Sequence, residues 1–161
     1  MNTLSGSTCD VRGSSNGSCN LLIQGSGFQS GALTFVGGKA CLATANTRVN
    51  GAQSISCEVP SGFKGKANVK VIQDGLQVEL KDAFTYTGTP SFNMIKVTLE
   101  KCSGCHGFVD DYAGVSSTKD SIWNRIGVLT PNSGAAYMGN YLTAQEIQQF
   151  KDWLDGGGLN Q

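Results

Sequence analysis

The sequence predicts two small domains, a β-sandwich followed by a helical domain, because its patterning changes near Pro90. Before this residue, short apolar or alternating runs are separated by glycine and polar clusters, which is typical of a sandwich of short strands. After it, apolar residues recur at intervals of three and four, which is typical of amphipathic helices. We place the linker in the short polar stretch 87–91 and predict domains at residues 1–88 and 89–161.

Six or seven short strands are expected in the first domain, and the clearest runs are Leu21–Ile23, Leu33–Val36, Ile55–Val59, Val69–Ile72, Val78–Leu80 and Ala83–Tyr86. The pair Asp74-Gly75 predicts a two-residue hairpin turn, because glycine accepts the positive φ that such turns require. Gly25–Phe28 predicts a tight corner that returns one aromatic ring to the core. The aromatic residues expected in the core are Phe28, Phe35, Phe63, Phe84 and Tyr86.

Five stretches of the first domain follow one another in a recognisable order, namely Asn20–Phe28, Val36–Ala40, Ser54–Pro60, Ala67–Val71 and Phe84–Tyr86. Their order and spacing resemble the IPT/TIG family of immunoglobulin-like domains over residues 15–87. The resemblance implies an all-β immunoglobulin-like sandwich that serves as a binding or spacer module without catalysis. Such a fold by itself does not identify a ligand.

Four cysteines, Cys9, Cys19, Cys41 and Cys57, lie in the first 60 residues without the spacing or the histidines of a metal site. They are interpreted as disulfides formed in an oxidising compartment, the alternative being buried thiols of a cytosolic domain. Four cysteines allow three pairings. The resemblance implies that Cys41 and Cys57 pair on neighbouring strands, which leaves Cys9 to pair with Cys19.

The second domain contains the motif Cys102-Ser103-Gly104-Cys105-His106. Two thiols three residues apart, followed by an imidazole, fit covalent attachment of haem, with His106 as an iron ligand. His106 is the only histidine, so neither bis-histidine haem ligation nor a zinc finger with two histidines is possible within the chain. The alternatives are a zinc corner completed by a distant cysteine and a CxxC redox disulfide.

The residues leading to this motif have helical spacing. Phe92, Ile95, Leu99, Cys102 and His106 recur at intervals of three and four, which predicts one helix running into the motif. Ser91 is its expected N-cap.

A final helix is predicted from Ala144 to Asp155. Thr143 and Glu146 form a capping box, Leu142 and Ile147 a hydrophobic staple, and Gly156 stands at the C′ position. Its expected inward face is Ile147, Phe150 and Leu154, with Trp153 at the edge, covering the helix that leads to the motif. A shorter helix is expected at Lys119–Ile126.

The second axial ligand of the iron is sought among the methionines Met1, Met94 and Met138. Met94 would lie about 18 Å before His106 on the same helix, and Met1 belongs to the other domain. Met138 follows a segment rich in glycine, proline and serine that can wrap a haem edge. We therefore predict Met138 as the ligand, although a methionine within a chain more often fills a core.

Together these features of residues 91–158 resemble class I cytochrome c. The resemblance implies a small all-α cytochrome c fold with one haem c, bound through Cys102 and Cys105 and ligated by His106 and Met138. The chain lacks the family's Gly-Pro after the histidine and has Tyr112–Val115 there, so the acceptor of the imidazole N–H is not predicted.

The expected function is electron transfer. The protein would be an electron carrier, not an enzyme, passing single electrons between extracytoplasmic redox partners, with the β-domain as a docking or spacer module. One alternative is a haem sensor or peroxidase-like enzyme with a labile sixth ligand, and another is a glycan- or protein-binding module with an accessory haem. Trp123 and Arg125 are candidate haem-pocket residues.

Charge and hydropathy indicate which kinds of partner and which cellular location are expected. Residues 1–90 carry seven basic and five acidic side chains, and residues 91–161 carry five and seven. The acidic second half favours a redox partner with a basic docking face, and the absence of a basic stripe disfavours nucleic acid. No apolar run of about 18 residues exists, so no transmembrane segment is expected. Disulfides and covalent haem both predict an extracytoplasmic location, which is periplasmic, cell-surface or secreted.

Overall fold

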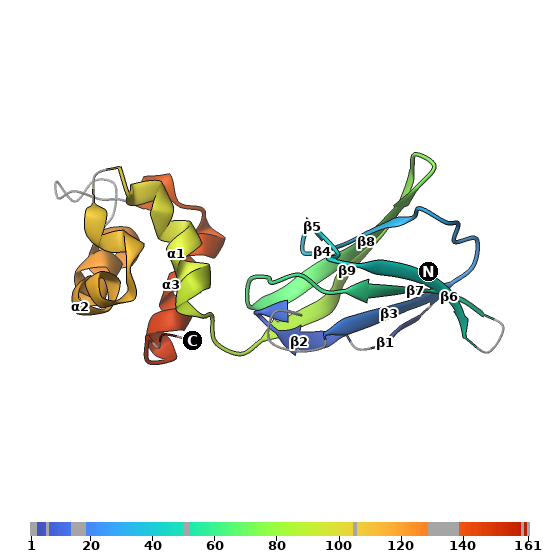
Figure 1. The fold of residues 1–161 in the computed structure, drawn as a ribbon, viewed down its shortest axis with the longest axis horizontal. Helices are drawn as coiled ribbons and strands as arrows, with labels where there is room; N and C mark the ends of the chain where they lie inside the picture. Colours follow the sequence, from blue (N-terminus) through green and yellow to red (C-terminus); the bar gives the residue numbers. More distant parts are fainter. Residues whose placement is uncertain are drawn as a thin grey trace. The chain divides into compact units, whose positions relative to one another are not determined.

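The structure is a computed structural model that describes residues 3–5, 7–13, 19–49, 52–104, 106–128, 139–158 and 160. The chain divides into two compact units, Met1–Gly88 and Thr89–Gln161. Strands occupy the blue-to-green part of the chain and helices the yellow-to-red part (Figure 1).

The described residues of the first unit form two sheets, which is consistent with an immunoglobulin-like sandwich. The first sheet has the antiparallel order β1-β3-β7-β6, with β1 at Thr3–Ser5, β3 at Asn20–Gly25, β7 at Ala52–Glu58 and β6 at Thr44–Val49. The second has the order β2-β9-β8-β4-β5, with β2 at Thr8–Asp10, β9 at Leu76–Thr87, β8 at Gly65–Gln73, β4 at Leu33–Val36 and β5 at Lys39–Ala40. Strand β2 pairs in parallel with β9.

Side chains that alternate along the strands fill the core of the sandwich. The buried members include Leu21, Ile23, Val36, Ile55, Val69, Val71, Phe84 and Tyr86. Of the aromatic residues expected there, Phe84 and Tyr86 are buried, whereas Phe28, Phe35 and Phe63 are only half-buried. Phe35 faces away from its buried neighbours Thr34 and Val36 because successive strand residues point to opposite faces, and the ammonium of Lys70 lies over its ring.

The predicted hairpin turn is confirmed. Asp74 and Gly75 have φ of 49° and 76°, and Gln73 pairs with Leu76 across the turn. The two predicted runs Val78–Leu80 and Ala83–Tyr86 belong to the single strand β9. The polar residues between the two runs lie at an irregularity in the pairing of β9 with β8, where Asp82 has φ of 52°.

Four strands were not predicted, namely β1, β2, β5 and β6. All four lie at or next to a sheet edge, since β1 and β6 end the first sheet and β2 and β5 end the second. An edge strand has one neighbour and needs no continuous apolar pattern, which explains why the polar stretch Thr44–Val49 gave no signal.

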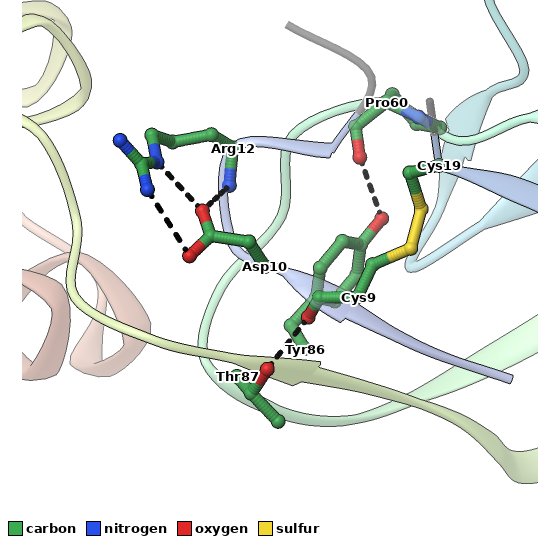
Figure 2. Close-up of a disulfide and its surroundings, with 7 residues drawn as sticks. All are labelled: Cys9, Asp10, Arg12, Cys19, Pro60, Tyr86 and Thr87. Atoms are coloured by element: carbon green, nitrogen blue, oxygen red, sulfur yellow. Dashed lines mark hydrogen bonds and ion pairs between the residues drawn. A yellow bond between two sulfur atoms is a disulfide. The ribbon is translucent and has the colours of Figure 1, made fainter. Parts of the chain in front are cut away.

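Two disulfides have the predicted pairing, Cys9–Cys19 and Cys41–Cys57. Cys9 lies on β2 of the second sheet and Cys19 directly precedes β3 of the first, so this bridge connects the two sheets (Figure 2). The expectation that Cys41 and Cys57 lie on neighbouring strands is wrong. Cys41 lies between β5 and β6, where the chain crosses from one sheet to the other, and Cys57 lies on β7.

The second unit is helical in its described residues. It contains α1 (Phe92–Leu99), the 3₁₀ turns η2 (Glu100–Cys102), η3 (Gly107–Asp110) and η5 (Gly139–Tyr141), α2 (Tyr112–Trp123), the π-helical turn η4 (Asn124–Val128) and α3 (Ala144–Asp155). Its buried core comprises Phe92, Ile95, Leu99, Val109, Val115, Ile122, Ile126, Leu142, Phe150 and Trp153. In the described part of the chain, no helix has the length and hydrophobicity to cross a membrane.

Helix α3 has the predicted bounds and capping box, but its buried face is different from the prediction. Gln149, Phe150 and Trp153 are buried, whereas Ile147 and Leu154 lie at the margins. The contact with α1 includes the rings of Phe92 and Trp153, whose centroids are 6.2 Å apart. Packing against this aromatic ring therefore turns Trp153 fully inward.

The other helix boundaries also differ from the predictions. Helix α1 ends at Leu99 and continues as a 3₁₀ turn, so the motif is not reached by one α-helix, and Ser91 occupies the N-cap position without a side-chain hydrogen bond. Helix α2 begins at Tyr112, well before Lys119, because Asp111 caps it by accepting the Gly114 N–H at 2.8 Å. The first half of α2 is only weakly apolar, so the sequence pattern did not indicate that a helix begins at Tyr112.

At the end of α3, Gly156 is the C-cap with φ of −81°. The next residue, Gly157, has a positive φ of 91°. The C′ position assigned to Gly156 therefore belongs to Gly157, while the helix ends at Asp155 as predicted.

Candidate functional site

The cysteine-histidine motif forms a hydrogen-bonded turn after α1. Cys102 is the last residue of η2, and its carbonyl oxygen accepts the His106 N–H at 3.0 Å. The carbonyl oxygen of His106 in turn accepts the Val109 N–H at 3.2 Å. Cys102 and His106 are both half-buried, and Cys105 lies outside the described residues. The backbone thus holds Cys102 and His106 in one compact turn.

A cavity of about 270 Å³ adjoins this turn and is lined by Leu99, Cys102, His106, Val109, Thr118, Ser121, Ile122, Arg125 and Ile126. Residues of α1, η2 and η3 form one wall, and residues of α2 and η4 form the other. The apolar members also belong to the buried core of the helical unit, so core side chains form part of the cavity lining. Its size is near the lower end of ligand-binding cavities, which begin at about 300 Å³.

Polar side chains on α2 and η4 give this cavity one polar wall. Thr118, Ser121 and Arg125 recur at helical intervals, and the hydroxyl of Thr118 donates to the Gly114 carbonyl oxygen at 2.7 Å. Arg125 is exposed and lies in the π-helical turn. Within the described part of the chain, no salt bridge is formed by its guanidinium. A cation is therefore available at the edge of an apolar cavity.

Trp123 and Arg125, the two predicted pocket residues, have different positions. Arg125 lines the cavity, whereas Trp123 is not among the described residues that line it. The half-buried Trp123 packs against the helical core, and Gly127 lies so close that a Cβ there would overlap the indole ring. Trp123 thus supports the turn that carries Arg125.

The residue types in the described lining of this cavity are those that the predicted haem would need. A thiol and an imidazole lie on one wall, apolar side chains supply most of the lining, and a guanidinium stands at the edge. The described residues contain no group of three or more His, Cys, Asp or Glu side chains arranged to hold a metal ion. The predicted roles of Cys105 and Met138 concern residues outside the described part of the chain.

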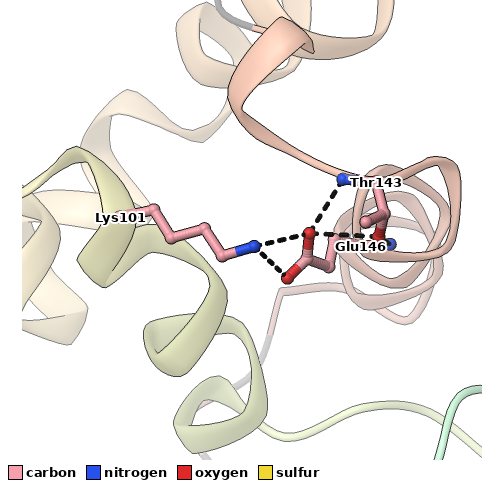
Figure 3. A network of polar contacts seen from close by, with 3 residues as sticks. All are labelled: Lys101, Thr143 and Glu146. Carbon is pink, nitrogen blue, oxygen red and sulfur yellow. Dashed lines mark hydrogen bonds and ion pairs between the residues drawn. The ribbon is translucent and has the colours of Figure 1, made fainter.

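A polar network joins the motif to α3 (Figure 3). The Lys101 ammonium donates to both carboxylate oxygens of Glu146, at 2.7 and 2.9 Å. Glu146 also accepts the Thr143 N–H at 2.8 Å, and its own N–H donates to the Thr143 hydroxyl at 3.2 Å. Partial burial alone would raise the pKa of Glu146, but the hydrogen bonds from Lys101 and Thr143 outweigh it and lower this pKa.

Sequence reasoning missed parts of this site. Thr118, Ser121 and Ile122 follow helical spacing, and their common face could have been found had the start of α2 at Tyr112 been recognised. The pairing of Lys101 with Glu146 has no comparable signal, because 45 residues separate the two in the chain.

The β-domain has a smaller cavity of about 150 Å³, lined by Ser26, Gly27, Phe28, Val71, Gln73, Leu76 and Val78. The Gln73 amide donates to the Gly27 carbonyl oxygen and accepts the Gln29 N–H, so it holds the wall formed by residues 26–29. Leu76 and Val78 are exposed beside it.

The first unit has a counterpart among known protein families. The family model of the IPT/TIG domain matches residues 10–88, so the first unit is similar to that domain. The match extends a few residues beyond the range 15–87 expected from the motifs. No curated protein matches the chain.

Proposed function

We propose that this protein is an exported c-type cytochrome that carries single electrons between extracytoplasmic redox partners. Its helical unit would hold one covalently attached haem, and its IPT/TIG-like domain would act as a docking or spacer module. The observation that carries the proposal is the cavity whose wall contains both Cys102 and His106 and whose lining is mainly apolar. This combination supports haem more specifically than the motif alone.

The residues of the motif divide the binding between them. Cys102 and Cys105 would hold the haem through thioether bonds, and His106, together with Met138 outside the motif, would bind the iron. The haem would supply a reversible one-electron couple. The buried side chains of Leu99, Ile122 and Ile126 line the cavity and would exclude water from the haem, and a dry surrounding of this kind would affect the reduction potential.

Arg125 is proposed to bind a haem propionate. Its guanidinium stands at the edge of the cavity, and guanidinium groups bind carboxylates with paired, charge-assisted hydrogen bonds. Trp123 contributes by supporting the π-helical turn in which Arg125 lies.

Two further features support the proposed extracytoplasmic location and the proposed type of redox partner. Two disulfides are typical of proteins in oxidising compartments, which supports an extracytoplasmic location. The second half of the chain carries seven acidic and five basic residues, and the propionates would add negative charge. A redox partner with a basic docking face is therefore the favoured type.

The test is to produce the chain in a bacterial periplasm with a haem-attachment system and to extract the purified protein with acidified acetone. Colour that stays with the protein indicates covalent haem, and Cys102→Ser should reduce this retained colour. Ser103→Ala is the matched control, because Ser103 lies between the motif cysteines and its hydroxyl donates a local hydrogen bond to the Glu100 carbonyl oxygen. Complete loss of colour from the wild-type protein would contradict the proposal.

The spectrum separates electron transfer from the sensor or peroxidase-like alternative. Methionine ligation gives a sulfur-to-iron charge-transfer band in the oxidised protein, and Met138→Ala should abolish it. A high-spin spectrum of the wild-type protein would favour an open sixth position. Met94→Ala is the control, and loss of the band in that variant would assign the ligand to Met94.

The cavity of the β-domain favours a docking role for that domain. Leu76 and Val78 are 76% and 51% exposed beside it, although apolar side chains of this size are usually buried. Leu76→Ser together with Val78→Ser should weaken association with the redox partner without changing the haem spectrum. Unchanged association would leave the domain as a spacer.

A further inference from the structure

Glu146 takes part in two sets of hydrogen bonds in the helical unit. It is the third residue of α3, where it completes the capping box with Thr143. It also receives both hydrogen bonds from Lys101, the residue immediately before Cys102. One carboxylate therefore ties the start of the last helix to the turn that carries the first motif cysteine (Figure 3).

The contact approaches the motif turn from outside the cavity. Cys102 lines the cavity, but Lys101 and Glu146 are not among its described lining residues. Among the described residues, Ser103, the next residue, makes its hydrogen bonds to Glu100 within the same turn. The ion pair with Glu146 thus links this turn to a separate helix, whereas the bonds of Ser103 stabilise the turn locally.

The pair differs from an ordinary surface contact on its carboxylate side, whereas the Lys101 side chain is 46% exposed. The Glu146 side chain is only 14% exposed, and each of its oxygens accepts a bond from Lys101. The hydrogen bonds from Thr143 orient the carboxylate before Lys101 binds, so less side-chain entropy is lost on pairing. In the pair Lys151–Asp155 on the same helix, the carboxylate side chain is 61% exposed, compared with 14% for Glu146.

We propose that Glu146 is a positioning residue that holds the Lys101–Cys102 turn in register with α3 and thereby fixes the orientation of the haem attachment motif. This inference rests on the proposed haem-binding function. The same carboxylate anchors Thr143, which follows Met138 by five positions in the sequence. Breaking the pair would release the motif turn from the start of α3 and would weaken the proposed binding of the iron by methionine.

Two substitutions break the pair without removing the cap. Glu146→Gln retains an acceptor suited to the capping box but loses the charge, and Lys101→Met retains most of the side-chain length. Lys101→Arg preserves the cation and should restore the wild-type behaviour. Thr143→Ala weakens the cap but leaves the Lys101 contact, and Lys151→Met breaks an exposed pair on the same helix.

The measurements are the sulfur-to-iron band of the oxidised protein and the midpoint potential. Lys101→Met and Glu146→Gln should each lower both, and the double variant should lose no more than the larger single effect, because the two residues act as one pair. Lys101→Arg and Lys151→Met should match the wild type. A merely structural contribution would lower the unfolding temperature but leave the band and potential of the folded protein unchanged.

Two results would overturn the positioning role. One is wild-type band intensity and potential in both Lys101→Met and Glu146→Gln, and the other is a loss in Thr143→Ala that equals the loss in Glu146→Gln while Lys101→Met is unaffected. A wild-type protein without covalent haem would instead contradict the proposed function itself. The two failures are therefore distinguishable.

Discussion

The hydroxyl group of Tyr86 donates a hydrogen bond of 2.9 Å to the carbonyl oxygen of Pro60 in the interior of the sandwich (Figure 2). Tyr86 is 1% exposed, and Gly62 lies so close that a Cβ there would overlap the tyrosine ring. The contact ties β9 to the segment that follows β7, which belongs to the other sheet. Replacement of the hydroxyl is therefore a direct test of how the sheets are held together.

Tyr86→Phe should lower the free energy of unfolding by about 1–2 kcal/mol, because the buried Pro60 carbonyl oxygen loses this donor. Unfolding is best followed by far-ultraviolet circular dichroism, since both tryptophans lie in the helical unit. Tyr112→Phe is the control, because its hydroxyl bonds to Gly158 at a half-buried position and its loss should cost less. If both substitutions lowered the free energy of unfolding equally, burial of the Tyr86 hydroxyl would not explain its effect.

Alkaline pH should destabilise the sandwich through the same residue. Burial raises the pKa of Tyr86 to about 12, whereas an unfolded tyrosine has a pKa of about 10. Between these values the unfolded chain releases the proton and the folded protein retains it, so stability falls as pH rises. Urea unfolding across this range should show a steeper fall in the wild type than in Tyr86→Phe. Parallel curves would mean that Tyr86 is not the group responsible.

Removal of the Cys41–Cys57 disulfide should cost about 3 kcal/mol, because the bridge closes a loop between residues 16 positions apart. The variant Cys41→Ser with Cys57→Ala is compared with Cys9→Ser with Cys19→Ala, whose bridge spans 10 positions. The shorter loop should contribute slightly less in the chain-entropy model. Calorimetry with and without reductant measures both, and an unchanged melting temperature on reduction would refute the expectation.

Acid should weaken the helical unit through Glu146. Its pKa is lowered in the folded protein, so its contribution is present above its ordinary pKa of 4.5 and is lost as pH falls through the folded value. Tryptophan fluorescence should show a melting temperature that declines below this pH in the wild type. Glu146→Gln should flatten the decline, whereas Asp155→Asn, at an exposed pair, should leave it nearly unchanged.

If haem is bound as proposed, Arg125→Gln should lower its reduction potential, because removal of a nearby positive charge favours the oxidised iron. Lys96→Gln makes the same change in net charge on α1, away from the described lining of the cavity, and should have a smaller effect. Potentiometric titration measures both. An equal shift in the two variants would argue against a specific position for Arg125.

Local signals in the sequence predicted the elements whose structure depends on neighbouring residues. The Asp74-Gly75 turn and the Thr143–Glu146 capping box were predicted correctly, because both are formed by residues a few positions apart. The start of α2 was missed, since its cap at Asp111 precedes a helix with few buried apolar residues. Edge strands such as β6 were missed for a related reason, because one-sided pairing does not require an apolar pattern.

The candidate site was predicted only in part. The motif and its apolar approach through Leu99 could be recognised in sequence, and Arg125 was among the candidates. The opposite wall required α2 and η4 to be placed against η3, which depends on how buried side chains such as Val109 and Ile122 fit together. Trp123 and Arg125 are two residues apart in the chain, yet only Arg125 lines the cavity.

By itself, the sequence determined that the chain has a strand-rich half and a helical half and which cysteines form disulfides, and it is the source of the proposal of a haem at the Cys102–His106 motif. These properties depend on residue type, spacing and short-range backbone geometry. Only the tertiary structure decided which side chains face the cavity, that both disulfides lie where the chain passes between sheets, and that Lys101 meets Glu146. Such contacts depend on the packing of elements distant in the chain, because only packing brings their side chains within bonding distance.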